Sequence, residues 1–509
     1  MRHIALSAAA ITALSLSLVP VSAAYADPAL CQGAGVIKAT ANDQTVDGTA
    51  GDDVISTDGF DRVTINGLAG ADVICLGDSV SPVVNAGDGA DKVYAQTSAT
   101  PKVDGGAGDD LIEDRAAGAD PKLGGELSGG DGADTITLTS RTTVAKGGAG
   151  ADKLTVAANV ETAPTAASGK YPTVQPGPGD DTVDGGGTAL LSFADATGPI
   201  TVDLAAGKAT GDGTDTLTNV VNVVGSPAAD TITGSDAAND IEAGAGDTVD
   251  AKGGDDVLTA NGAKSVLGGD GNDKITATGT EAVDSGAGND TLVLTSSNAM
   301  TRSGDDTITA TKSKVHAGTG ADTITQNGGS SDGGWGPDKI EVVNYGVARG
   351  GAKADVLRGS LDSAPEKAGT GGIRLRGEGG RDTVYVWAGA RKKAGDRVHG
   401  GSGVDKVHLG KLEGGAIVDL ASNRVVQRPT AGSPKWKRVP APEFESIEGS
   451  RYNDRLYGDS GANHIDGNKG RDVLFGRAGA DRLHGGKGKD TIFGGSGFDR
   501  CSGEKRRSC

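Results

Sequence analysis

The sequence predicts an all-β protein whose short parallel strands stack coil upon coil into a parallel β-roll or β-solenoid. Glycine supplies 86 of the 509 residues, and aromatic residues make up only 3% of the chain. Short glycine-rich motifs recur at nearly constant intervals, and each ends in an aspartate followed two residues later by an aliphatic residue. A narrow stack can be filled by Val, Ile, Leu and Ala, because each coil buries its apolar positions against its neighbours.

The repeated motif is close to G-G-x-G-x-D-x-U-x, where U is aliphatic, as in GGDGNDKIT from Gly268. Glycine permits backbone angles that side chains forbid, so the first half of the motif predicts a tight turn. The aliphatic residue then begins a short strand. In the middle of the chain the aspartates stand 16 or 17 residues apart, at Asp273, Asp290, Asp306, Asp322, Asp338 and Asp355.

Two other periods flank the central one. Near the amino end the aspartates recur every 19 residues, and from Gly449 to Ser502 six nonapeptides follow without a gap. Nine residues make one turn and one strand, so two units complete a coil. We therefore expect a single row of aspartates along one edge through most of the chain, and two rows only after Gly449.

The repeated carboxylates indicate calcium, bound as multiple ions. Calcium prefers six to eight oxygen ligands and accepts carboxylates together with main-chain carbonyls. Without metal, carboxylates about 4.8 Å apart would repel along each edge, so we expect folding and calcium binding to be coupled. The predicted carboxylate ligands are Asp53, Asp72, Asp91, Asp110, Asp134, Asp152, Asp181, Asp256, Asp273, Asp290, Asp306, Asp322, Asp338, Asp405, Asp454, Asp472, Asp481, Asp490 and Asp499.

These nonapeptides resemble the RTX, or hemolysin-type, calcium-binding repeats of bacterial secreted proteins, whose fold is a parallel β-roll. Sequences such as GRAGADRLH and GGKGKDTIF carry the resemblance. It implies that the sixth-position aspartates are side-chain ligands and that the preceding glycines offer main-chain carbonyls. Asn463 replaces the aspartate in one unit. The glycines predicted to contribute are Gly268, Gly269, Gly271, Gly485, Gly486 and Gly488.

The chain is expected to be exported. Residues 1–26 have a weakly basic start, an apolar run and an Ala24-Tyr25-Ala26 cleavage site, which is typical of a signal peptide. No later segment is long and apolar enough to span a bilayer, so we expect a secreted, extracellular protein, either free or associated with a cell surface. The rest divides into an N-terminal solenoid of 19-residue period (27–160), a loop and non-calcium β module (161–224), a central solenoid (225–412), a second non-calcium module with a basic loop containing Pro and Trp (413–448), and the tandem nonapeptides with a cysteine cap (449–509).

The four cysteines lie in two pairs at opposite ends of the predicted stack. Some twenty coils at about 4.8 Å each would separate the ends by on the order of 100 Å. A disulfide tolerates Cα separations of only about 7 Å. We therefore expect Cys31–Cys75 and Cys501–Cys509, each closing one end.

Charge is unevenly distributed along the chain. Residues 1–346 carry 19 basic and 48 acidic side chains, a net charge of −29, whereas residues 347–509 carry 30 and 20, a net charge of +10. A basic carboxyl-terminal third suits an anionic cell-wall polymer, another surface glycan or phospholipid headgroups, and solvated surface charge is the alternative. Nucleic acid does not suit an exported chain that is acidic overall. The predicted surface contacts are Tyr385, Trp387, Lys435, Trp436 and Lys437.

Threonines that flank inward-facing isoleucines, such as Thr307 and Thr309, also suggest an ice-binding face. Such a face needs an unbroken ladder, and Val293 interrupts it. The ordinary β-propensity of threonine is therefore the better explanation.

We expect a secreted calcium-binding β-solenoid that folds on calcium binding and serves a structural, adhesive or cell-envelope interaction role. The alternative is a polysaccharide-acting β-helix enzyme of the lyase or epimerase type. In such an enzyme Tyr385 and Trp387 would stack a sugar beside Arg391, Lys392 and Lys393. The sequence shows no paired acid and base residues, so no catalytic residue is assigned.

Overall fold

A computed structural model describes residues 31–95, 100–114, 125–139, 143–157, 171–360, 372–387, 396–428 and 437–509. Every named element within these ranges is a β-strand, which confirms the predicted all-β solenoid. Among the same residues no helix is long and apolar enough to cross a membrane. The expected signal peptide, residues 1–26, lies outside the described part of the chain.

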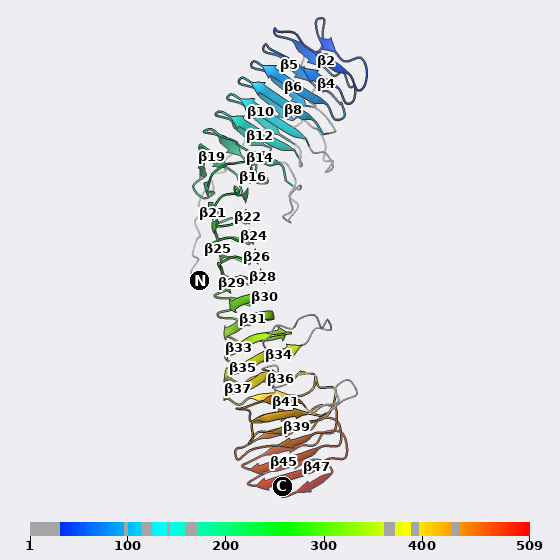
Figure 1. The fold of residues 1–509 in the computed structure, drawn as a ribbon, viewed down its shortest axis with the longest axis vertical. Coiled ribbons are helices and arrows are strands. Elements are labelled where there is room, and N and C mark those ends of the chain that lie inside the picture. The colour runs from blue at the N-terminus through cyan, green and yellow to red at the C-terminus, as the bar shows by residue number, and fades with distance from the viewer. Residues whose placement is uncertain are drawn as a thin grey trace, which may run out of the picture.

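The chain winds into a stack of coils (Figure 1). The coils have two strand-bearing faces, and pairing is continuous along one of them. On this face, which we call face A, parallel pairing runs without a break from β2 (Thr45–Asp47) to β48 (Arg500–Ser502). The opposite face, face B, starts with β1 (Ile37–Lys38) pairing with β3 (Val54–Ser56). Each coil therefore passes two edges: edge 1, where the chain goes from face A to face B, and edge 2, where it returns.

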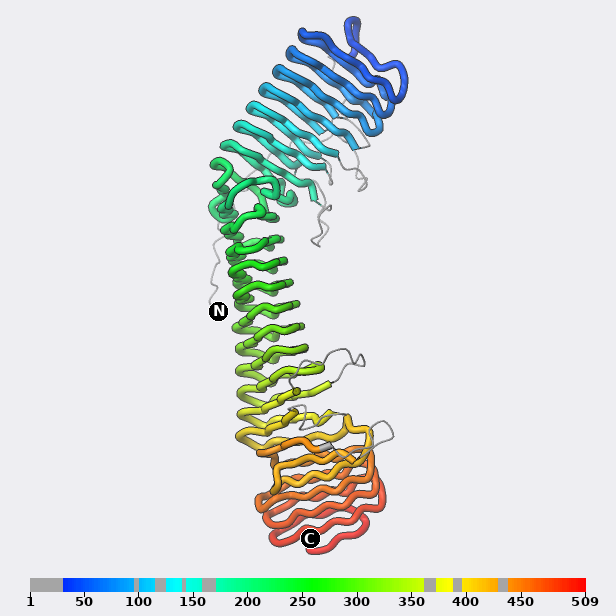
Figure 2. The backbone as a smooth tube through the Cα atoms, in the orientation of Figure 1, coloured from blue at the N-terminus to red at the C-terminus, as the bar shows by residue number. Residues whose placement is uncertain are grey.

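Face B is interrupted twice by an antiparallel hairpin. The first interruption comprises β17 (Thr201–Asp203), β18 (Lys208–Thr210) and β19 (Thr214–Thr218). The second comprises β39 (Ala416–Asp419), β40 (Arg424–Gln427) and β41 (Lys437–Pro440). In both cases the first strand of the hairpin starts a new parallel run on face B, with β21 (Thr231–Ser235) and β43 (Arg455–Tyr457). Figure 2 shows the axis of the stack turning where the first hairpin lies.

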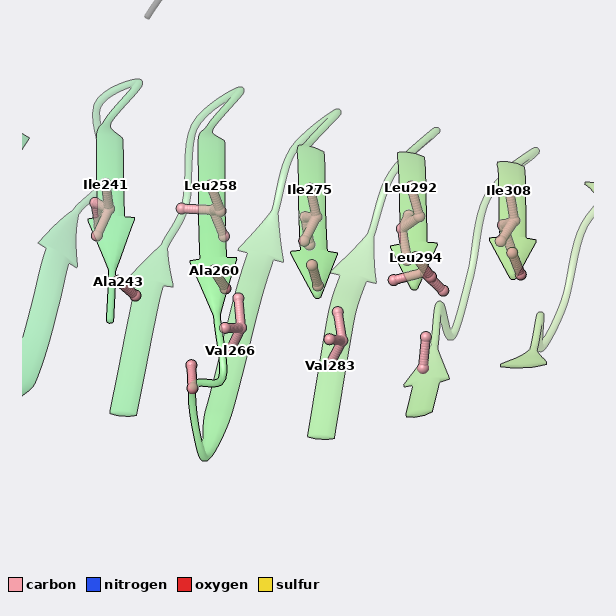
Figure 3. Close-up of a cluster of buried hydrophobic side chains, with 14 of the residues drawn as sticks. Ile241, Ala243, Leu258, Ala260, Val266, Ile275, Val283, Leu292, Leu294 and Ile308 are labelled. Atoms are coloured by element: carbon pink, nitrogen blue, oxygen red, sulfur yellow. The ribbon is translucent and has the colours of Figure 1, made fainter. Parts of the chain in front are cut away.

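The core is a narrow column of aliphatic side chains between the faces (Figure 3). On face A, Leu258, Ile275 and Leu292 lie above one another in β24 (Val257–Asn261), β26 (Lys274–Thr278) and β28 (Thr291–Thr295), and each is at most 2% exposed. Val266 and Val283 project from face B into the same column. Burying each such side chain stabilises the fold by about 1.5–3 kcal/mol, so the stack needs no large aromatic core.

The glycine turns let successive coils approach closely. Gly271 has a φ of +142°, and a Cβ atom there would overlap the carbonyl oxygen of Gly254 in the preceding coil. Its N–H donates to the Ala287 carbonyl of the following coil at 2.8 Å. Only glycine fits between two stacked turns in this way, which explains the fourth position of the motif.

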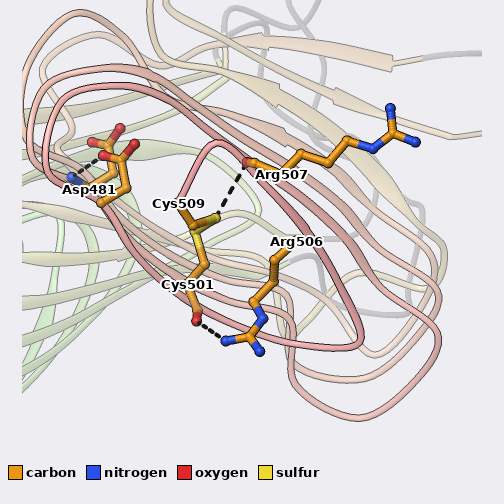
Figure 4. The surroundings of a disulfide bond; sticks show 6 residues. Asp481, Cys501, Arg506, Arg507 and Cys509 are labelled. Atoms are coloured by element: carbon orange, nitrogen blue, oxygen red, sulfur yellow. Dashed lines mark hydrogen bonds between the residues drawn. A yellow bond between two sulfur atoms is a disulfide. The ribbon is translucent and has the colours of Figure 1, made fainter.

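Disulfides close both ends of the described stack, in the expected pairing. Cys31 and Cys75 are bonded with Cα atoms 6.2 Å apart, and Cys501 and Cys509 with Cα atoms 5.8 Å apart. At the carboxyl end Arg506 donates to the Cys501 carbonyl at 3.1 Å (Figure 4). The last strand is thereby held to the terminal coil.

Candidate calcium-binding edges

The sixth-position aspartates form ladders that run from coil to coil. One carboxylate oxygen of each, Oδ1, accepts a hydrogen bond from the main-chain N–H of the aspartate in the preceding coil. Asp256 donates to Asp273 and Asp273 to Asp290, both at 2.9 Å. The same contact recurs from Asp53 to Asp215, from Asp290 to Asp405, and between Asp454, Asp472 and Asp490. We call each ladder an aspartate file.

The files change edge along the molecule, which the sequence did not predict. The first file, Asp53 to Asp215, lies at edge 1, because each aspartate lies at, or just before, the start of a face B strand. The central file, which begins at Asn239 and Asp256, lies at edge 2. The hairpin at β17–β19 separates the two files, since it starts a new face B run whose glycine turns come at the other edge.

Two files coexist in two places rather than one. After Gly449 Asp454, Asp472 and Asp490 line edge 1 while Asn463, Asp481 and Asp499 line edge 2, as expected. Just after the first hairpin, however, Asp230 donates to Asp247 at edge 1 beside the Asn239–Asp256 pair at edge 2. The expectation of two rows only after Gly449 is therefore wrong, because a short double file follows each hairpin.

The second oxygen of most of these carboxylates, Oδ2, is buried and receives no hydrogen bond. Such an oxygen is costly unless it is protonated or contacts a cation. The described aspartates in this state are Asp72, Asp91, Asp110, Asp134, Asp152, Asp181, Asp256, Asp273, Asp290, Asp306, Asp322, Asp338, Asp355, Asp382, Asp405, Asp472, Asp481, Asp490 and Asp499.

The backbone conformation at the second motif position determines whether Oδ2 receives a hydrogen bond. In every one of these turns that residue has a positive φ, as at Gly269 (+113°), Gly486 (+87°) and even Leu68 (+83°) and Arg477 (+80°). Where the residue is Ser or Thr without a positive φ, its N–H donates to Oδ2 instead: Ser450 to Asp454 at 2.7 Å.

Asp53 and Asp454 therefore differ from the other predicted ligands. Thr49 donates to Asp53 Oδ2 from both its N–H and its hydroxyl, at 2.5 and 2.8 Å. Ser450 makes equivalent bonds to Asp454. These two carboxylates are satisfied within their own turn. The residue type at the second position was the signal in the sequence that distinguishes them.

We call a carboxyl group orphaned when its Oδ2 is buried and receives no hydrogen bond. Burial favours the neutral, protonated form of many of these groups. It raises the pKa of Asp256 and Asp355 to about 8, of Asp110, Asp181, Asp322 and Asp472 to about 7, and of Asp134, Asp273, Asp338 and Asp382 to about 6. The hydrogen bond from the preceding coil acts in the opposite direction, and the neighbouring carboxylates of the file add to the increase.

The surroundings of Oδ2 suit a hard cation. Beside Gly268, the position that a side chain would occupy is bordered by Asp273 Oδ2 and by the main-chain carbonyl of Ser285 in the next coil. Gly476 is placed in the same way, beside Asp481 Oδ2 and the Gly494 carbonyl, and Gly485 lies beside Asp490 Oδ2. Carboxylate and carbonyl oxygens are the donors that calcium accepts. No described group of three or more His, Cys, Asp or Glu side chains forms a metal cluster, so main-chain oxygens must supply part of any coordination.

Edge 1 of the central run carries hydroxyls where edge 2 carries carboxylates. Thr280 N–H donates to Ser297 Oγ, and Ser297 N–H to Ser313 Oγ, both at 3.1 Å. These hydrogen bonds run from coil to coil as in the aspartate file, but each acceptor is a neutral hydroxyl. Sequence reasoning missed this ladder, and it left the file members Asp215, Asp230, Asp247, Asp355 and Asp382 out of the predicted ligands.

Of the five predicted surface contacts, the structure describes the side chains of Trp387 and Tyr385. Trp387 is 3% exposed and packs in the core against Gly359, so the expectation that it faces outward is wrong. Tyr385 is half-buried on face A, stacked on His408 at 4.2 Å with Arg358 over its ring. Lys437 begins β41, and its side chain, like Lys435 and Trp436, lies outside the described residues. The same is true of Arg391, Lys392 and Lys393.

Comparison with protein families identifies the turns. Residues 222–250, 265–292, 444–474 and 466–501 match the RTX calcium-binding nonapeptide repeat. The chain carries RTX calcium-binding repeats. Three of these four matches fall where both edges carry a file, and the fourth falls in the central single file. The resemblance seen in the sequence is thereby confirmed.

No curated protein matches the chain. A solved structure, the X-ray crystal structure of a hyperactive, Ca²⁺-dependent, β-helical antifreeze protein from an Antarctic bacterium, is 18% identical over 71% of this chain and 88% of that chain, with a TM-score of 0.24. A likeness at this level supports no inference about binding.

Proposed function

We propose that this protein is a secreted calcium-binding β-solenoid that completes its folding on calcium binding and acts as a rigid structural or adhesive component at the cell envelope. The supporting observation is the series of buried carboxylate oxygens without donors, set in RTX repeats. A metal-free coil must keep each such group protonated or bear an uncompensated charge.

The orphaned aspartates would hold the ions together with carbonyls of their own and the next turn, as Asp273 with Ser285. Bound calcium supplies charge neutralisation and a bridge between coils. Asp53 and Asp454 stay outside this set, because Thr49 and Ser450 already satisfy them. In a calcium-poor cytosol the chain remains incompletely folded and fit for export, and it folds outside the cell.

The test is circular dichroism and thermal melting of the protein from residue 27 onward, in EDTA, in calcium and in magnesium. We expect the β signal and the cooperative melt to require calcium and to return on its addition. Magnesium demands near-octahedral geometry and should substitute poorly. A sample that keeps its full β spectrum and melting point in EDTA contradicts the proposal.

The enzyme alternative loses half of its expected sugar platform, because Trp387 is in the core. What remains on face A is Tyr385 stacked on His408, with Glu448 contacting His408 and Lys406 at 3.1 Å. Glu448, the carboxylate beside the ring, is thereby engaged by Lys406 and His408, while Arg358 lies over the ring itself. The structural and adhesive role is therefore the better supported of the two.

A second candidate function is suggested by a threonine array on face A. In β26, β28, β30 (Thr307–His316) and β31 (Thr323–Trp335), Thr276 aligns with Val293, Thr309 and Thr325, and Thr278 with Thr295 and Thr311. A third row comprises Thr291, Thr307 and Thr323. Val293 lacks the hydroxyl but keeps the shape of threonine. Lys274 of β26 is in register with Thr291, so the third row has a lysine beside it, whereas the first two rows carry no charged side chain on these four strands. Hydroxyls and methyls at regular spacing suit an ordered water surface such as ice.

Ice recrystallisation in calcium-containing solution tests this candidate. We expect the protein to slow crystal growth and T309K/T325K to abolish the effect, whereas T135K/T137K, on face B of the N-terminal coils, should not. An unmodified rod without any effect on crystal growth removes the candidate and leaves the calcium proposal intact.

A further inference from the structure

An arginine-rich surface lies on face B just before the second hairpin. It is formed by β33 (Gly346–Ala352), β35 (Ile373–Gly380) and β37 (Arg397–Gly403), which pair in parallel. Arg349, Arg376 and His399 are in register across the three strands, and Arg374 and Arg397 form a second row beside them. We call these five residues the arginine ladder. All four arginines are exposed.

Most of this positive charge is not neutralised within the described chain. Arg349 contacts Glu378 at 3.5 Å, and His399 contacts Glu443 at 3.3 Å. Arg374, Arg376 and Arg397 have no carboxylate partner among the described residues. Their attachment points are about 4.8 Å apart between coils and about 6.7 Å apart along a strand. Three guanidinium groups at this spacing repel one another unless an external anion lies between them.

The ladder is a local feature of face B. Earlier coils of the same face place mixed residues at the equivalent outward positions, such as Ser330 and Asp332 in β31 and Asn298 and Met300 in β29 (Asn298–Met300). Arginine at both outward positions of β35 therefore does not follow from the solenoid repeat. The fold of these three coils does not require it.

An aromatic hollow adjoins the ladder at edge 2. Trp335, at the end of β31 and in register with Ala352 of β33, is 67% exposed. With Pro337, Lys353 and Arg381 it lines a hollow of about 640 Å³. The strands that carry the arginines lead into these turns. An indole face beside two more cations suits a sugar ring that bears an acidic group.

We propose that the arginine ladder and the Trp335 hollow bind a linear anionic polysaccharide. Guanidinium groups pair bidentately with carboxylate or sulfate, and strands hold them at fixed spacing, so little entropy is lost on binding. The repeated charges of the polymer match the two rows, and Trp335 stacks one of its rings. This inference rests on the proposed surface role and names its partner class.

The test is titration of the calcium-loaded protein with unsulfated chondroitin, which carries carboxylates only, with chondroitin sulfate and with uncharged dextran. We expect binding to one or both anionic glycans, weakening as salt rises, and none to dextran. R374Q/R376Q/R397Q should weaken binding at least tenfold, and Trp335→Ala several-fold. R482Q/K489Q/R500Q, which removes the same charge from the carboxyl-terminal coils, should change binding less than twofold.

Three outcomes overturn the inference: no binding by the folded protein, equal losses in both triple variants, or equal binding to anionic lipid vesicles without any effect of Trp335→Ala. Circular dichroism of the same samples separates this result from the proposed function. Calcium-induced folding without glycan binding contradicts the ladder alone. Glycan binding by a protein that folds equally in EDTA contradicts the calcium proposal alone.

Discussion

The central coils and the carboxyl-terminal block use one turn sequence but distribute charge differently. Between Asp256 and Asp355 only edge 2 carries an aspartate file, and edge 1 carries a ladder of hydroxyl acceptors from Thr280 to Ser313. After Gly449 both edges carry carboxylates, and each file begins with a satisfied residue, Asp454 or Asn463. The difference shows that each edge separately determines whether a buried Oδ2 receives a hydrogen bond, through the side chain at the sixth motif position and the backbone conformation at the second.

Calcium removal should have the largest effect and should affect the two regions unequally. Each occupied site at a calcium concentration 100 times its Kd contributes about 2.7 kcal/mol, and the terminal block carries files on two edges instead of one. In EDTA we expect hydrogen exchange to accelerate first in residues 449–502 and later in 256–355. Equal acceleration in both regions would contradict the expected difference in calcium dependence between them.

Without calcium, pH should act in the opposite sense to its action with calcium. The raised pKa values of Asp256, Asp322 and Asp355 mean that the folded state holds these protons more tightly than the unfolded chain. That stabilisation is complete below about pH 4 and is lost as the pH rises to the folded-state pKa values of about 7 and 8. Melting temperatures in EDTA should fall between pH 4 and pH 8. In calcium they should rise over the same interval, because binding needs the ionised form.

Single substitutions should separate orphaned from satisfied carboxylates. Asp273→Asn should cost about 1–3 kcal/mol in calcium and little in EDTA, where it removes a buried charge. Asp454→Asn, the matched control, loses charge-assisted bonds from Ser450 and should cost a similar amount under both conditions. Denaturant titrations with and without calcium measure both values. A calcium-dependent cost for Asp454→Asn would show that the second-position rule is wrong.

The smallest expected effect concerns a strained turn of the N-terminal coils. Leu68 occupies the second position with a φ of +83° and is 52% exposed. Relief of this strain in Leu68→Gly, offset by the entropy of glycine, should stabilise the protein by about 0.5 kcal/mol. Thermal melts in calcium provide the measurement, and Leu267→Gly, at an exposed strand position, serves as the control that should destabilise.

The fold and most of the file members could be predicted because period and residue type are local properties of the sequence. The change of edge could not, since it depends on how β17–β19 rejoin face B. The burial of Trp387 was missed because alternation was extended two residues beyond the end of β36 (Thr383–Tyr385). The arginine ladder did leave a signal, the alternation in Ile373-Arg374-Leu375-Arg376, but its neighbours 23 residues away become adjacent only in the stack.

The unbroken pairing of face A has a mechanical consequence. A force applied at β2 is transmitted through parallel strand pairs along face A to β48. Along face B the parallel pairing is interrupted at the two hairpins. We expect such a rod to resist extension and to bend at the two hairpins. Bending there changes the angle between its ends while the coils stay paired along face A.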